Sequence, residues 1–113
     1  MIHKLKTINP YFTAVWKGHK TFEIRKNDRN FAINDILYLL EFEPFPNNDG
    51  GLYHRGIKCM ITYILDNPTY LQSGYVGLGV VVLDRFECGE IGSILTNLEV
   101  IELKKDKPTE VSP

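Results

Sequence analysis

The residues best suited to chemistry lie in one charged stretch, 18–31, which carries five basic side chains (counting its histidine) and two acidic ones. Arg25 offers a planar donor fork that suits an anionic group, and Lys20 offers a point charge. Glu23 could hold either cation in place. Charged groups held at fixed separations on one strand are what a polar binding site needs. Spacing alone also allows a plain surface ion pair between Glu23 and Arg25, which would add little stability.

The same stretch has the alternation of a β-strand. Phe22 and Ile24 share one parity, whereas Thr21, Glu23 and Arg25 share the other, and the two sets point to opposite faces of a strand. We therefore expect an apolar back against the core and a charged front that faces the ligand. On this interpretation Phe22→Ala costs about 3–5 kcal/mol, and Arg25→Ala weakens anion binding with little loss of stability.

The elements around this strand predict a small β-rich domain. Asn9 and Pro10 are typical of a helix start, Gly18 is typical of a helix end, and the segment between them has an apolar face that ends in Trp16. Further strands are expected at 3–6, 36–42, 53–65, 75–83 and 95–103. An Asn34–Asp35 turn precedes the strand at 36–42. The predicted class is α+β, mainly β: a mixed-to-antiparallel barrel of five or six strands with one or two short helices.

Composition indicates one domain, for which we expect residues 1–104 with a flexible tail at 105–113. No apolar run is long enough to cross a bilayer and the first residues do not form a signal peptide, so we expect a cytoplasmic protein without membrane contact. Cys59 and Cys88 have no metal-like spacing with each other or with the histidines, and we expect two buried free thiols. The sequence predicts neither a metal nor a cofactor, and it does not indicate an oligomeric state.

Charge is distributed unevenly along the chain. The net charge is −1, which argues against nonspecific binding to nucleic acid by the whole surface. Residues 1–29, however, carry seven lysines and arginines against two acidic residues, a balance of +5, while the remainder carries −6. This asymmetry favours a local anion site in the first third of the chain.

The motif Gly18-x-Lys20-x-x-Glu23-x-Arg25 resembles the signature of the ASCH domain, a member of the PUA-like superfamily, and the longer sequence resembles the DUF3850 branch of that group. The resemblance covers roughly residues 2–82. It rests on several blocks in the same order, namely His3–Lys6, Tyr11-Phe12, Lys20–Arg29, Asp35, Thr62–Leu65 and Gly74–Gly79.

This resemblance implies a PUA-like β-barrel with a helix beside a cleft, and a role in binding RNA or nucleotides. Lys20, Glu23 and Arg25 would then line the cleft. Arg29 and Arg55 are further candidates for contacts with backbone phosphates, and tyrosines at 11, 53 and 75, Tyr75 first among them, could stack on bases.

The resemblance also keeps an enzyme open. Some ASCH-like proteins are amidohydrolases that act on N-acylated cytidine nucleosides, and ribonuclease activity is ascribed to others. The hydrolases use a lysine that matches Lys20, but they have a threonine where this chain has Glu23, so their mechanism does not transfer directly. The candidates for catalysis would be Lys20 with Glu23 as an acid/base pair on RNA, or Thr21 as a nucleophile. A third alternative is an adaptor barrel that contacts a protein through its charged strand.

Overall fold

Five strands form one sheet in the computed structural model, which describes residues 1–89. In chain order the elements are β1 (Ile2–Thr7), α1 (Tyr11–Trp16), β2 (Phe22–Lys26), β3 (Ile36–Pro44), β4 (Gly51–Leu65) and β5 (Tyr75–Phe86). The expected mainly-β fold with a short early helix is confirmed. The expected strand at 95–103 and the tail at 105–113 lie outside the described residues.

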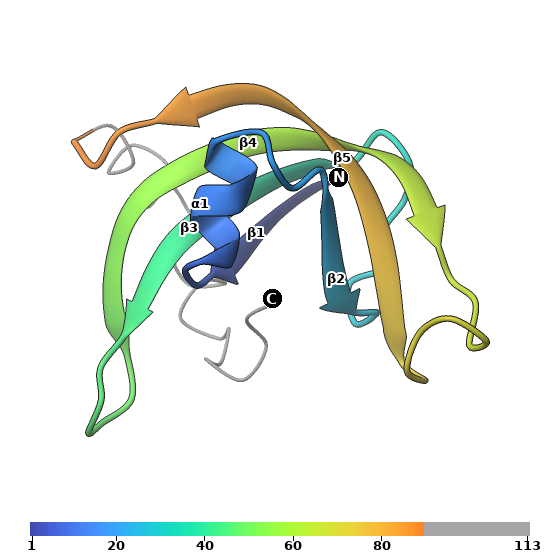
Figure 1. Ribbon diagram of the computed structural model, residues 1–113, viewed down its shortest axis with the longest axis horizontal. Helices are drawn as coiled ribbons and strands as arrows, with labels where there is room; N and C mark the ends of the chain where they lie inside the picture. Colours follow the sequence, from blue (N-terminus) through green and yellow to red (C-terminus); the bar gives the residue numbers. More distant parts are fainter. Residues whose placement is uncertain (90–113) are drawn as a thin grey trace.

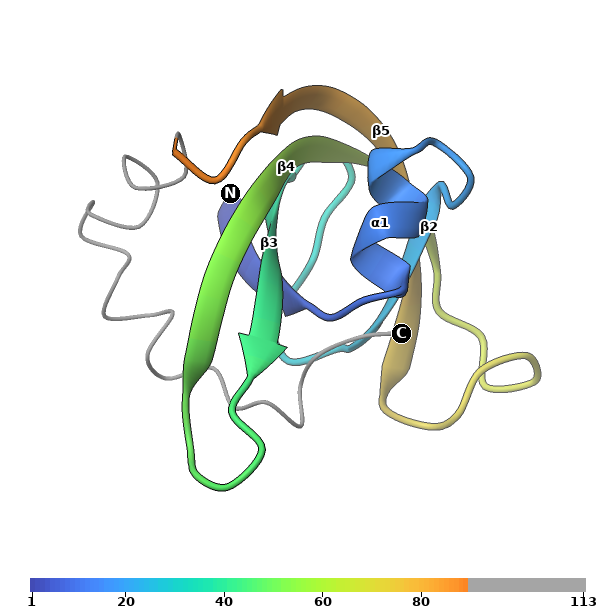
Figure 2. The same ribbon diagram turned by 60° about the vertical axis from the view of Figure 1, so that its left-hand side comes forward.

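The strand order across the sheet is β1-β3-β4-β5-β2. β1 pairs with β3 in parallel, and the other three pairings are antiparallel, so the sheet is mixed as expected. The sheet curls into a half-barrel and brings β1 and β2, its two ends, toward each other (Figures 1 and 2). β4 is long enough to follow this curve, and its register with β5 shifts twice along the way.

The helix α1 lies in the hollow of the curled sheet (Figure 2). Its residues Phe12 and Val15 are fully buried, and they pack with inward-facing residues of four strands in one core cluster. Asn9 accepts a hydrogen bond from the backbone N–H of Thr13 at 3.0 Å, and Gly18 has a φ of +80° just past the helix. The helix end signal at Gly18 therefore predicted the local structure correctly, whereas the helix begins one residue later than expected: Pro10, not Asn9, is the N-cap, and the Asn9 side chain bonds the first turn from one position further out.

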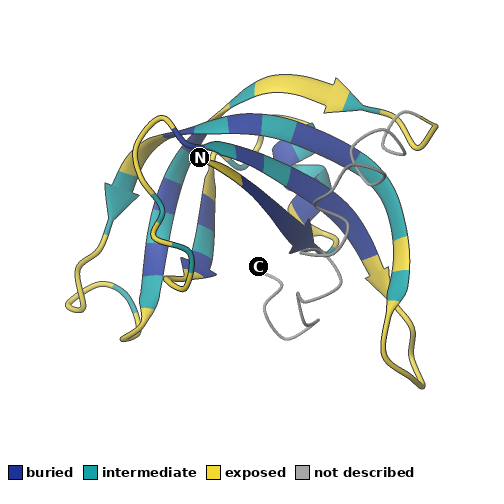
Figure 3. Ribbon diagram, turned by 180° about the vertical axis from the view of Figure 1, so that it is seen from behind, coloured by how far each residue is buried: buried dark blue, intermediate teal, exposed yellow. Residues whose placement is uncertain are grey.

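The burial pattern along the strands shows which face of each points to the core (Figure 3). In β2 it contradicts the expected orientation: Phe22 is 48% exposed, whereas Glu23 has no exposed surface and Arg25 is 5% exposed. Alternation identifies two faces but not which one is inward. Here the polar face turns inward because each charge on it has a partner there, as described below.

Two further observations concern the expectations for cysteine and membrane contact. Cys59 is buried and free, but Cys88 is exposed, so only one of the two thiols is buried as expected. Among the helices of residues 1–89, none has the length and apolar character needed to span a bilayer.

Candidate functional site

A buried ionic triad stands at the centre of the charged motif. Lys20 Nζ lies 2.9 Å from Glu23 Oε1, and Arg25 Nε lies 3.5 Å from Glu23 Oε2. The Lys20 side chain is only 10% exposed. Glu23 itself has no exposed surface, which places its carboxylate inside the core. Burial raises the pKa of the Cys59 thiol to about 12, and the nearby Glu23 carboxylate adds to this shift. Two cations around one carboxylate explain how a charged strand face can point inward.

The other end of Arg25 reaches across to β1. Its Nη2 donates to the backbone carbonyl of Lys6 at 2.7 Å and to Thr7 Oγ1 at 3.0 Å. Arg29 Nη1 lies 3.4 Å from the carbonyl of Lys4 on the same strand. β1 is an end strand of the sheet, so its outer carbonyls lack a neighbouring strand within the described residues. The two arginines supply donors along this edge and bridge β1 to β2.

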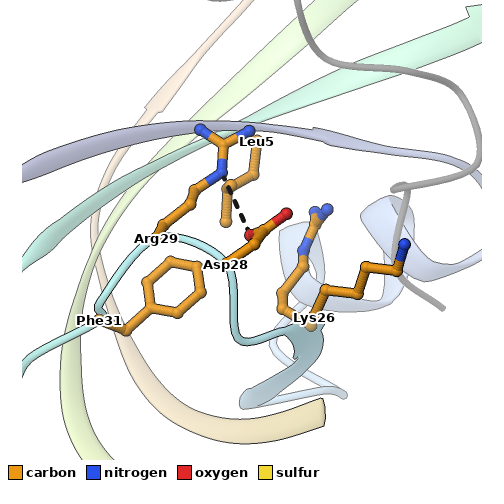
Figure 4. A pocket seen from close by; sticks show the side chains of 6 residues that line it. Leu5, Lys26, Asp28, Arg29 and Phe31 are labelled. Carbon is orange, nitrogen blue, oxygen red and sulfur yellow. Dashed lines mark ion pairs between the residues drawn. The ribbon is translucent and has the colours of Figure 1, made fainter. Parts of the chain in front are cut away.

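Between these bridges lies a narrow pocket lined by Leu5, Arg25, Lys26, Asp28, Arg29 and Phe31. Its volume is about 10 Å³, which is room for roughly one water-sized group. In Figure 4, Lys26, Arg29 and Asp28 surround the pocket and Phe31 forms one wall. The lining has three cations and one carboxylate, and Asp28 Oδ1 is 3.9 Å from Arg29 Nε. The pocket therefore has a positive balance, which suits an anionic oxygen atom.

A larger groove of about 500 Å³ lies elsewhere, lined by Ile8, Asn9, Pro44, His54 and residues 41–43. Glu41 holds a bidentate pair with Arg55, with Nε–Oε1 at 2.8 Å and Nη2–Oε2 at 2.9 Å. Hydrogen bonds from Arg55 lower the pKa of Glu41 to about 2. His54 Nε2 lies 2.9 Å from Glu43 Oε1. Because its lining contains two carboxylates and no lysine or arginine, this groove is a poorer place for phosphate than the narrow pocket.

The structure brings together some of the predicted site residues and separates others. Lys20, Glu23 and Arg25 form the triad, and Arg29 joins Arg25 at the pocket. Arg55 does not line the pocket: its guanidinium is held by Glu41 and lies 4.6 Å from the ring centre of Trp16.

The other predicted residues have varied environments. Tyr75 is half-buried and does not line the pocket, but it pairs across β2 and β5 with Lys26, which does. Tyr53 packs against Phe42 with ring centres 5.1 Å apart, and Tyr11 is 37% exposed with Lys20 Nζ 5.9 Å from its ring centre. Thr21 is exposed, and its carbonyl accepts the N–H of Val80 at 3.0 Å.

Sequence reasoning missed Lys26, Asp28 and Phe31 as pocket residues. The sequence did indicate Lys26: it is a basic residue next to Arg25, and a turn separates it from Arg29 three positions later. The bridging carbonyls of β1 gave no such signal, since any residue type carries a carbonyl.

No group of three or more histidine, cysteine, aspartate or glutamate side chains within residues 1–89 is arranged to hold a metal ion.

Comparison with known proteins identifies the family of the chain. It is 32% identical over 99 residues to an uncharacterized 12.9 kDa protein in the GpA 3′ region of Escherichia phage P2, an alignment that covers 88% of this chain and 80% of the phage protein. Residues 2–80 match the DUF3850 family, a domain of unknown function. Given these two matches and the fold, the chain belongs to the DUF3850 family.

Proposed function

We propose that this protein binds RNA or a nucleotide, as an ASCH- or PUA-like domain, through a phosphate site at the pocket between β1 and β2. The observation that carries the proposal is the three cations, Arg25, Lys26 and Arg29, around one narrow pocket with a single carboxylate. Arg25 is already fixed by its bonds to β1, so contact with an anion there requires little ordering of its side chain. Lys26 is exposed at the rim and can approach a phosphate from solvent.

The size of the pocket limits what it can recognise. A cavity for one water-sized group accepts a phosphate oxygen but not a base. Contacts with phosphate position a nucleic acid and carry no sequence information directly. The proposed site therefore predicts salt-sensitive binding with weak dependence on base identity at this position.

The test is fluorescence anisotropy of a short single-stranded RNA across a salt series, with wild type, Lys26→Gln and Arg29→Gln. Each variant should weaken binding and reduce the salt slope, by about 0.7 for each lost phosphate contact on a single strand. Lys58→Gln, the same charge change at a residue that does not line the pocket, is the matched control. Equal binding by all four proteins, or no binding by wild type, would refute the proposal.

A second candidate function is hydrolysis of an N-acylated cytidine nucleoside or of RNA. The observation that favours it is the Lys20–Glu23 pair at 2.9 Å, with a Glu23 Oε2 that accepts no hydrogen bond from a described residue. The exposed Thr21 is less suited, because it lies at the surface before β2. Since Glu23 has no exposed surface, a substrate would have to displace Lys20, and we place binding first for this reason.

Chromatography of N4-acetylcytidine, and gels of RNA, after incubation with the protein test this second function. Product formed by wild type and lost in Lys20→Met would support it. If the wild-type protein leaves both substrates intact, the proposed hydrolysis is refuted.

A further inference from the structure

The outer face of the sheet carries a gap flanked by two exposed aromatic rings. In the register of the sheet, Gly79 of β5 lies between Phe22 of β2 and Tyr63 of β4. Residues directly paired across neighbouring strands share a face, so both rings stand on the same side as the missing side chain of Gly79. Phe22 is 48% exposed and Tyr63 is 63% exposed. We call the space above Gly79, between these rings, the aromatic slot.

The width of the slot follows from sheet geometry. Neighbouring strands lie about 4.8 Å apart, so the backbones that carry the two rings are separated by roughly 10 Å. A flat ring stacked between two others needs about 3.5 Å on each side, or about 7 Å between the outer rings. One planar ring therefore fits between Phe22 and Tyr63 if these side chains stand up from the sheet. A side chain at position 79 would reduce this space, because a Cβ there would already lie 3.3 Å from Tyr63 Cβ.

The charge around the slot indicates what kind of ring it suits. Lys20 Nζ lies 5.3 Å from the centre of the Phe22 ring, but Glu23 holds it at 2.9 Å and its side chain is only 10% exposed, so the accessible charge on this side is that of Lys26. Lys26 is on the outer face of β2 together with Phe22, four residues further along the strand. The paired positions of β5 on this face, from Tyr75 to Gly79, carry no acidic side chain. An aromatic ring attached to an anion matches this surface, and the ring of a nucleobase attached to a phosphate has that chemistry.

The slot also lies at a useful distance from the proposed phosphate site. Phe22 and Lys26 are separated by four strand residues, or about 13 Å along β2. A short single strand whose phosphate sits at Lys26 and Arg29 can follow the outer face of β2 and bring one of its bases over Gly79. The narrow pocket excludes a base, and the slot is a place where one can lie.

We propose that the aromatic slot is a base-stacking subsite for single-stranded RNA, with Phe22 and Tyr63 stacking on one base above Gly79. This inference rests on the proposed function and adds the contact through which a base, and not only a phosphate, is held. Stacking on aromatic side chains tolerates every base, so the subsite contributes affinity with little sequence preference.

The experiment uses a short single-stranded RNA that contains 2-aminopurine, whose fluorescence is quenched when it stacks on an aromatic ring. Phe22→Leu and Tyr63→Leu keep an apolar side chain but remove the ring. Each should weaken binding by roughly 5- to 100-fold and abolish most of the quenching, as expected for the loss of stacking on one base. Leu83→Ala, at another exposed apolar residue of β5, is the control and should change neither signal. Thermal unfolding of every variant shows that the sheet is intact.

The outcomes separate this inference from the proposed function. RNA that binds wild type, Phe22→Leu and Tyr63→Leu equally well, in a salt-sensitive manner, overturns the stacking subsite and leaves the phosphate site standing. RNA that does not bind wild type at all overturns both. A wild-type dimer in sedimentation that Phe22→Leu converts to a monomer, without RNA, would show that the slot packs against a second copy of the chain and would also overturn the subsite.

Discussion

Replacing Glu23 with alanine is the sharpest test of the buried triad. The substitution leaves Lys20 and Arg25 in the interior without the carboxylate that both of them approach. Removing one partner of a buried ion pair costs about 3–5 kcal/mol, because the remaining charge stays buried without compensation. Against a total stability of about 5–15 kcal/mol, this loss is at least about a fifth of what holds the domain folded.

Urea unfolding followed by the fluorescence of Trp16, the single tryptophan, measures this loss directly. With an m value of about 1.5 kcal/mol/M, the midpoint should fall by roughly 2–3 M in Glu23→Ala. The matched control is Phe22→Ala at the neighbouring position. Phe22 is 48% exposed, so its truncation should cost no more than about 1 kcal/mol.

The opposite ranking would refute this interpretation of β2. If Phe22→Ala lost 3 kcal/mol or more while Glu23→Ala lost less than 1 kcal/mol, the apolar residues of the strand would face the core and the charged ones would face solvent. That result would restore the orientation expected from the sequence, and the triad could no longer be treated as structural.

Three further perturbations follow from individual contacts. Arg55 holds the pKa of Glu41 near 2, against an ordinary 4.5, so this carboxylate contributes stability that is complete above about pH 4.5 and is lost as the pH falls through 2. The loss amounts to about 3 kcal/mol. In urea unfolding between pH 4.5 and 2, the stability of Glu41→Gln should therefore depend less on pH than that of wild type. In the native protein the exposed Cys88 should react with a thiol reagent such as 5,5′-dithiobis(2-nitrobenzoate) at once, and Cys59, buried and with a pKa near 12, only on unfolding; two fast thiols would contradict the buried position of Cys59. Gly51→Ala should lower the thermal midpoint by several degrees, since the added Cβ would lie 2.6 Å from Phe42 Cζ and against backbone at the β3–β4 hairpin.

The sequence predicted the elements of the fold better than the orientation of its central strand. The end of α1 at Gly18 and the left-handed Asn34, with a φ of 75°, follow from local chemistry that a few neighbouring residues decide. Such features need no knowledge of the rest of the chain.

The orientation of β2 depends on partners far away in the sequence. Alternation separates the two faces, and the cost of burying isolated charges then led us to expect the charged face in solvent. Glu23 and Arg25 can be buried because Lys20 and the carbonyl of Lys6 meet them inside, and the carbonyl lies 19 residues away from Arg25. The expectation that Arg25→Ala would leave stability unchanged was drawn from the wrong orientation, and with Arg25 at 5% exposure we now expect it to be destabilising.

The bridges from Arg25 and Arg29 to β1 join structure and proposed function in one motif. Within residues 1–89 the end strands β1 and β2 do not pair with each other, and backbone carbonyls at such an edge need donors. Here the donors are guanidinium groups, which bring positive charge to the gap that they cross. A pocket with a positive balance is then a direct consequence of how the sheet is held together, and it requires only Lys26 at the rim to become accessible to a phosphate. On this proposal the same side chains of the charged motif hold the sheet together and bind the phosphate. Variants at Arg25 would change both roles at once. Variants at Lys26, which does not bridge the strands, would test binding alone.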